Sequence, residues 1–328
     1  MQPEKGRHRD GGLRMESFMN WLSGLINLLV FPGLLFLFAC AMLFQWVDRK
    51  LYARLQSRVG PPWYQPLADF IKLLAKEDVL PEAADERMCA ALPLVAFAAV
   101  ATAILYVPVG RTTSYAFEGD LIVVAFLLWV PTLALSLAGW LSAGPFGLVG
   151  GLRALTQLFA YEVPFLMALC GPALLAGSWS ISELAAFQNG RIWTAALQPI
   201  GLLVALTCLV GKLERVPFDI PEADTEIVAG VLTEFSGRKL ALFRLALDME
   251  MVVGCALMGN LFLGGFNSLF LPTAITFLLK TLLVLFALSC IRALFARLRL
   301  DQMVRLSWGV LAPLSLAQLA AAVWMKGV

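Results

Sequence analysis

The chain has 328 residues, of which 60% are hydrophobic and 15% are charged, and its mean hydropathy is +0.79. A soluble domain of this length is usually about half apolar. The net charge of +2 is too small to indicate a nucleic-acid partner. Apolar stretches long enough to cross a bilayer recur along the whole sequence. Composition therefore predicts an all-α, polytopic membrane protein.

Side chains that could hold a redox centre are scarce and scattered. The only histidine is His8, in a polar tail, so a haem with two histidine ligands is excluded. The six cysteines form no C-x-x-C pair, which argues against an iron–sulfur cluster or a zinc site. The sequence also lacks a Walker loop and a G-x-G-x-x-G loop. We therefore expect the chain to bind no metal and no cofactor, and any redox chemistry to belong to partner chains.

The sequence divides into a polar tail, residues 1–18, and a single transmembrane domain, residues 19–328, with Met15 as an alternative start. Eight transmembrane helices are predicted, at 20–46, 89–109, 120–141, 153–177, 196–212, 240–264, 271–296 and 303–324. Lysine and arginine, Lys212 and Arg215 among them, concentrate in the loops after odd-numbered spans. These loops are therefore predicted to be cytoplasmic, and the expected location is the inner membrane, in contact with lipid.

The first cytoplasmic loop begins with a run of charges. Asp48 closes the first span, and Arg49, Arg54 and Arg58 follow it. Anchoring by the positive-inside rule accounts for this basic run. Docking of an acidic partner or of a lipid headgroup is the alternative.

An amphipathic helix is predicted further along the same loop, in residues 63–77, WYQPLADFIKLLAKE. Its apolar side chains share one helical face, while Asp69 and Lys72 fall on another. This pattern is typical of a helix that lies in the membrane interface or against a partner protein.

Several charges fall inside predicted spans. An ionised carboxylate at Glu162 is costly in hydrocarbon, so this side chain must face protein or water, or carry a proton. Asp248 and Glu250 lie in the sixth span, and Arg244, one turn before Asp248, lies on the same helical face and is a candidate ion-pair partner. An ion path and an internal pair that only fixes packing both remain open. Lys280, in the seventh span, is either a counter-ion or a side chain that extends to the interface.

The fifth loop is rich in carboxylates: Glu214, Glu222, Asp224, Glu226 and Glu234 lie in it or just after it. Glu222 and Glu226 are one helical turn apart, so their repulsion is expected to raise at least one pKa. Groups of this kind suit a proton relay, and a solvated acidic loop is the alternative. The carboxylates of the predicted ion path are Glu162, Glu214, Glu222, Glu226, Glu234, Asp248 and Glu250.

Several segments resemble the H-type subunit of respiratory complex I. The first loop, DRKLYARLQSRVGPP followed by QPLADFIKLLAKEDVLP, is similar to the first cytoplasmic loop of that family. So are AGWLSAGPFGLVGGLRALTQLFAYEVP, the acidic ERVPFDIPEADTEIVAGVLTEFSG, and RLRLDQMVRLSWGVLAPLSLA near the end. The similarity runs from about residue 35 to the C-terminus, and the PFDxPExxxE and ExSG elements occur in the family's order.

This resemblance implies an eight-helix subunit that joins a cytoplasmic redox arm to ion-translocating subunits, beside a quinone chamber and an acidic proton path. By motif, the path would include Glu162, Glu222, Glu226 and Glu234. The side chains that would face the redox arm are Asp48, Arg49, Arg54, Arg58, Asp69, Lys72 and Arg215.

The chain departs from the complex I pattern in two places. Few residues separate GPP from QPLAD, and GVLTEFSGRKLALFRLALDMEM looks closer to the membrane anchor of group 4 nickel–iron hydrogenases. That branch implies hydrogenase-like large and small subunits with iron–sulfur clusters and a nickel–iron centre, antiporter-like membrane subunits, and no quinone. A quinone-chamber subunit of complex I and a stand-alone secondary ion transporter are kept as alternatives; the lack of a visible internal repeat counts against the transporter.

Overall fold

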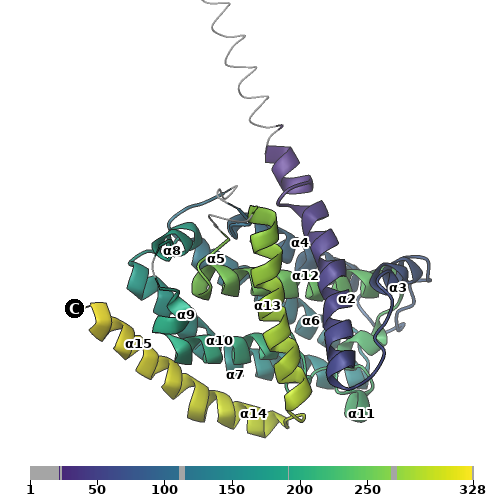
Figure 1. Ribbon diagram of the computed structural model, residues 1–328. Helices are drawn as coiled ribbons and strands as arrows, with labels where there is room; N and C mark the ends of the chain where they lie inside the picture. Colours follow the sequence, from purple (N-terminus) through teal and green to yellow (C-terminus); the bar gives the residue numbers. More distant parts are fainter. Residues whose placement is uncertain (1–21, 23, 111–114, 191, 267–271, 327–328) are drawn as a thin grey trace, which may run out of the picture.

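The computed structural model describes residues 22, 24–110, 115–190, 192–266 and 272–326, so the polar tail at 1–18 lies outside the described residues. The regular elements of the described chain are all helical, which confirms the all-α prediction (Figure 1). The long helices are α2 (Leu34–Leu55), α4 (Glu86–Tyr106), α6 (Val130–Leu141), α7 (Pro145–Ala176), α10 (Pro199–Lys212), α12 (Gly237–Phe262), α13 (Thr273–Leu294) and α15 (Ala312–Lys326). The shorter ones are α3 (Gln65–Leu74), α5 (Asp120–Leu127), α8 (Ile181–Phe187), α9 (Thr194–Leu197), α11 (Asp224–Ile227), the 3₁₀ turn η1 (Gly230–Glu234), α14 (Leu300–Leu306) and the π-helical turn η2 (Ser307–Leu311).

In the described chain, six helical segments are long and apolar enough to cross a membrane. They are Gly24–Leu55, Glu86–Tyr106, Asp120–Leu141, Pro145–Ala176, Thr273–Leu294 and Leu300–Lys326. The two other predicted spans correspond to α10, which is apolar but only 14 residues long, and to α12, which carries Arg244, Asp248 and Glu250 within its apolar sequence.

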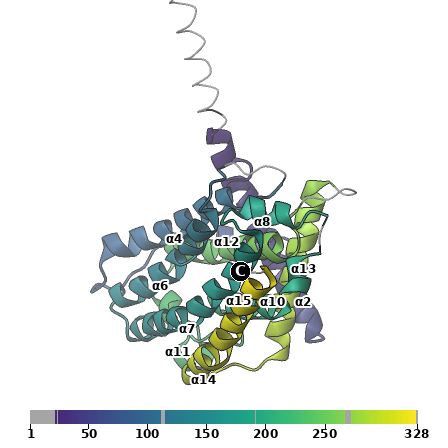
Figure 2. The ribbon, with the colours of Figure 1, turned by 90° about the vertical axis from the view of Figure 1, so that its left-hand side faces the viewer.

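The interior of the fold is organised around α12. This helix is buried on every side over most of its length, as expected for a helix that is apolar all round. It packs against α2, α4 and α13, while α7 packs against α6, α10 and α15. Figure 2 shows α4, α6 and α7 one below another, and Figure 1 shows α2 and α13 side by side. Carboxylates on α7 and α12 are therefore enclosed by protein.

The predicted amphipathic helix is present as α3 and packs on α2 and α12. Phe70 contacts Phe38 of α2, with ring centroids 5.5 Å apart. Leu67, Ile71 and Leu74 are exposed to the outside of the chain. An apolar face that is only partly covered suits a helix in the membrane interface, and its place there stays a prediction.

Small residues bring α6 and α7 into close contact. Gly139 of α6 faces Gly147 and Gly151 of α7, an arrangement that lets two membrane helices approach backbone to backbone. A Cβ on Gly151 would lie 2.6 Å from the carbonyl oxygen of Ser136. The sequence AGWLSAGPFGLVGG therefore fixes how closely the two helices pack.

Gly151→Ala should lower the stability of the protein by about 1–3 kcal/mol, because the added methyl group forces two backbones apart. The measurement is the midpoint of thermal unfolding in mild detergent. Gly309→Ala is the matched control, since nothing lies within 4 Å of a Cβ at that position. Equal midpoints for the two variants would contradict the packing argument.

Candidate functional site

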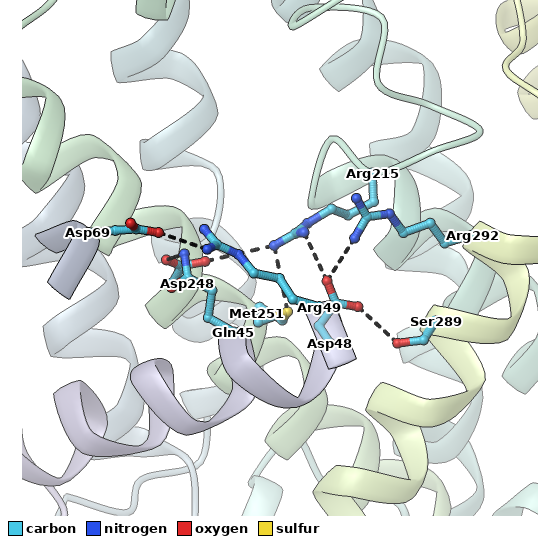
Figure 3. A network of polar contacts seen from close by, with 9 residues as sticks. All are labelled: Gln45, Asp48, Arg49, Asp69, Arg215, Asp248, Met251, Ser289 and Arg292. Atoms are coloured by element: carbon cyan, nitrogen blue, oxygen red, sulfur yellow. Dashed lines mark hydrogen bonds and ion pairs between the residues drawn. The ribbon is translucent and has the colours of Figure 1, made fainter. Parts of the chain in front are cut away.

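A network of ion pairs joins the ends of α2 and α13 to the loop that follows α10 (Figure 3). Asp48 of α2 is 5% exposed. Its Oδ2 accepts hydrogen bonds from Arg215 at 3.0 Å and from Arg292 at 2.8 Å, and its Oδ1 accepts one from Ser289 at 2.9 Å. One carboxylate thus binds two guanidinium groups, and Arg292 also stacks on Tyr52, 4.2 Å from the ring centroid.

Arg215 extends this network to α12. Its Nη2 lies 3.8 Å from Oδ1 of Asp248, whose Oδ2 accepts a hydrogen bond from Gln45 at 2.6 Å. The predicted partner, Arg244, is exposed, so the expected pairing within α12 is wrong: Asp248 instead contacts a loop and α2. A side chain from another element reaches the buried carboxylate, whereas Arg244 lines the cavity beside it without forming an ion pair with it. Figure 3 shows Arg215 between the two carboxylates.

Arg49, which follows Asp48 on α2, binds the amphipathic helix α3. Arg49 donates a hydrogen bond to Oδ2 of Asp69 on α3 at 2.9 Å, and Gln65 donates to Oδ1 at 2.9 Å. Partial burial raises the pKa of Asp69, but these hydrogen bonds outweigh it and hold the pKa below its ordinary value. Both side chains of the ion pair are about one-third exposed, so its contribution to stability is modest.

A polar cavity of about 350 Å³ opens beside this network. It lies among α2, α12, the end of α13 and the loop after α10. Charged and amide side chains dominate its wall: Gln45, Arg49, Glu214, Arg215, Asp219, Glu222, Arg244, Asp248 and Arg292. The apolar part of the lining is Leu213, Val216, Ala229, Leu232 and Leu247.

A second set of charges is buried more deeply, between α7, α10 and α12. Nζ of Lys212 donates to Oε2 of Glu162 at 3.0 Å, and the lysine is completely buried. The rings of Tyr161 and Phe165 flank the ammonium at 5.4 and 5.5 Å. Glu250 is also fully buried, and neither of its carboxyl oxygens has a hydrogen-bond partner in the described chain.

Glu214 links the cavity to these buried groups. It lines the cavity and is 5% exposed, and both of its oxygens lack a hydrogen-bond partner among the described residues. Burial, followed by the charges of Glu222 and Glu250, raises its pKa well above the ordinary value. Glu250 in turn interacts electrostatically with Lys212 and Glu162. The titratable groups therefore form one electrostatically connected series that begins at the cavity.

The remaining acids of the fifth loop behave differently from expectation. Helix α11 begins at Asp224, so Glu222 and Glu226 do not share one helical turn. Glu226 is exposed and accepts a hydrogen bond from Arg153 at 2.6 Å. That bond, and then the charge of Arg297 at 3.9 Å, lower the pKa of Glu226 rather than raise it.

Glu234 lies over the start of the long helix α7. A Cβ on Gly144, the residue before that helix, would meet its carboxyl group. The site is therefore at the positive end of a helix dipole, which favours a carboxylate. Among the described residues, Glu234 is thus placed apart from the buried pair of Lys212 and Glu162.

The predicted redox-arm residues separate into two groups. Asp48, Arg49, Asp69 and Arg215 meet in or beside the ion-pair network, whereas the side chains that remain exposed are Arg54, Arg58 and Lys72. Lys280 forms no ion pair with a carboxylate of the described residues, and its extension to the interface stays a prediction. It donates to the carbonyls of Leu263 and Gly265 at the end of α12, where a cation suits the helix dipole.

Sequence reasoning missed several members of the site. Lys212 is predicted only as a loop charge, and no local pattern in the sequence marks Arg292, Gln45 or Ser289 as members of the site. Lys212 directly follows the apolar run GLLVALTCLVG, which could have indicated a buried cation.

Asp48→Asn should destabilise the protein by about 3 kcal/mol, because two guanidinium groups would then face each other without a shared carboxylate. Thermal unfolding in detergent measures the loss. Asp301→Asn is the control, since Asp301 is an exposed aspartate at the start of α14. An Asp48→Asn midpoint equal to that of the control would show that the network contributes little.

Comparison with known proteins agrees with this architecture. The family model of NADH dehydrogenase matches residues 27–323. The H-type subunit of the NADH-quinone oxidoreductase of Bacillus cytotoxicus is 36% identical over 322 residues, covering 93% of this chain and 95% of the relative; that of Bacillus cereus is 35% identical, covering 93% and 96%. A chain of the membrane-bound sulfane sulfur reductase, an archaeal respiratory membrane complex, superposes with a TM-score of 0.82 and 26% identity, covering 92% of this chain and 99% of that one. This chain therefore belongs to the NADH dehydrogenase family, as an H-type subunit of a multisubunit respiratory membrane complex.

Proposed function

We propose that this chain is the non-redox membrane anchor and coupling subunit of an energy-converting oxidoreductase. In this role it links electron transfer in a cytoplasmic arm to the movement of protons or Na⁺ through buried carboxylates. The observation that carries the proposal is the series from the polar cavity through Glu214 to Glu250 and the pair of Glu162 and Lys212.

The energetic cost of this series supports a functional role. Burying an ionisable group without a partner is expensive, and Glu214 and Glu250 are buried with no hydrogen-bond partner in the described chain. Packing would be served better by apolar residues. Inside a membrane, ionisable groups that face the protein interior commonly mark ion pathways.

The ion-pair network offers a way to couple electron transfer in the cytoplasmic arm to ion movement through the buried carboxylates. Arg215 lines the cavity and contacts both Asp48 and Asp248. Electron transfer nearby would change the charge or the conformation at the cavity, and Arg215 would then favour one carboxylate over the other. Such a shift would alter the electrostatic potential at Glu214, which lines the same cavity.

The proposed partners follow from the hydrogenase-like branch of the resemblance. They are hydrogenase-like large and small subunits carrying iron–sulfur clusters and a nickel–iron centre, with antiporter-like subunits in the inner membrane. The exposed Arg54, Arg58 and Lys72 are proposed to face the cytoplasmic arm. The likeness to a respiratory complex that is not named for quinone supports this branch.

A quinone-chamber subunit is the second candidate, because the curated relatives are named NADH-quinone oxidoreductase. The cavity lining does not fit a quinone well. It is dominated by charged side chains and includes no aromatic residue, whereas sites for such ligands are mostly apolar. We therefore place no quinone in this polar cavity.

Glu250→Gln should leave assembly intact and lower coupled turnover at least tenfold, because glutamine has the shape of a protonated glutamate but cannot release the proton. Coupled turnover is measured as ion uptake by vesicles that contain the complex. Glu118→Gln, at an exposed glutamate, is the control. Glu162→Gln would leave the Lys212 ammonium unpaired, so it is best combined with Lys212→Met. Full coupling in Glu250→Gln and in the double variant would refute the carboxylate path.

Purification of the native complex in mild detergent through a C-terminal tag should recover an iron–sulfur small subunit and a large subunit with paired C-x-x-C motifs, as identified by mass spectrometry. Recovery of a flavin- and NADH-binding chain would favour the quinone-chamber function instead. A chain that purifies alone and stable would favour the stand-alone transporter.

A further inference from the structure

Lys212 introduces a fixed positive charge into what the sequence suggests is a purely acidic path. Its side chain is completely buried at the end of α10. Nζ donates to Oε2 of Glu162, while Tyr161 and Phe165 flank it. Oε1 of Glu162 has no hydrogen-bond partner in the described chain. The ammonium therefore occupies the cation position beside this carboxylate.

Charge balance then limits what the neighbouring carboxyl groups can do. One buried ammonium neutralises one carboxylate, and it is paired with Glu162. Glu214 and Glu250 are buried, and their oxygens have no hydrogen-bond partner among the described residues. Buried carboxylates without a cation are held as neutral acids. In this state the cluster holds dissociable protons and one ammonium group.

We propose that Lys212 determines the ion specificity of this buried cluster, so that the cluster exchanges protons and not Na⁺. The proposal rests on the function proposed above. Moving a proton from Glu250 to Glu162 leaves the net charge of the cluster unchanged. Binding Na⁺ would place a second cation beside an ammonium. Hard cations are also held by several oxygen ligands, and an oxygen of Glu162 is already bound by Lys212.

Infrared difference spectroscopy of the intact complex tests this directly. The purified complex is immobilised, NaCl is exchanged for choline chloride at constant pH, and the carbonyl stretch of protonated carboxylic acids is recorded. Glu250→Gln and Glu214→Gln assign bands to these side chains. The expected result is that the wild type and both variants give the same exchange spectrum. A Na⁺-sensitive carboxyl band that is present in the wild type and missing from either variant would overturn the proposal.

Removing the ammonium should create the sensitivity that the wild type lacks. Lys212→Met is expected to show a new Na⁺-sensitive carboxyl band and a turnover that changes severalfold between NaCl and choline chloride. Lys280→Met is the matched control, because Lys280 binds carbonyl groups rather than carboxylates. Lys212→Arg keeps the charge and should behave as the wild type. If Lys212→Met is as insensitive to Na⁺ as Lys280→Met, Lys212 is not the specificity determinant.

These outcomes separate the two proposals. Na⁺ binding at Glu250 in the wild type would overturn the specificity of the cluster while leaving the coupling function in place. Full coupling both in Glu250→Gln and in the double variant Glu162→Gln with Lys212→Met would refute the function and, with it, this inference. Should Lys212→Met fail to assemble, the wild-type spectrum and Lys212→Arg still decide: a Na⁺-sensitive carboxyl band in either one overturns the proposal.

Discussion

The arrangement of this protein depends on the need to neutralise charge that has been removed from water. Asp48 is shared by Arg215 and Arg292, and Arg215 also reaches Asp248. Removal of Asp48 would leave both guanidinium groups without the carboxylate that they share. The same constraint, met deeper in the bundle by Lys212 and Glu162, fixes the position of α10 against α7. Helices from distant parts of the sequence are thus held together by ion pairs as well as by apolar packing.

The outer network around Asp48 and the inner cluster around Lys212 differ in their balance of positive and negative groups. The function that we propose depends on this difference. The outer network pairs three guanidinium groups, those of Arg49, Arg215 and Arg292, with the three carboxylates of Asp48, Asp69 and Asp248. It borders a cavity that water can enter. The inner cluster has more carboxyl groups than cations and lies among α7, α10 and α12. Glu214 lines the cavity and responds to charges on both sides. A change of charge in the outer network therefore reaches the inner cluster through Glu214, whose pKa is raised by burial.

Much of the architecture could be predicted from the sequence, because long apolar runs and the amphipathic pattern of α3 are local signals. The burial of Glu162 could be predicted for the same reason. Pairing could not: Asp248 was assigned to Arg244 by helical spacing, but a loop arginine from outside α12 takes that place. Lys212 was assigned to a loop because counting basic residues does not show which way a side chain points at the end of a short helix. Long-range contacts determine both the partner of Asp248 and the orientation of Lys212, and the spacing of residues along the chain does not reveal such contacts.

Asp48 and Arg49 are neighbours on the last turns of α2, yet they serve different parts of the molecule. Asp48 is fixed in the buried network, while Arg49 holds Asp69 of α3, whose Leu67, Ile71 and Leu74 are left uncovered. A rotation of this end of α2 cannot move one contact without pulling on the other. Helix α3 and the charges inside the bundle are therefore linked through the same end of α2.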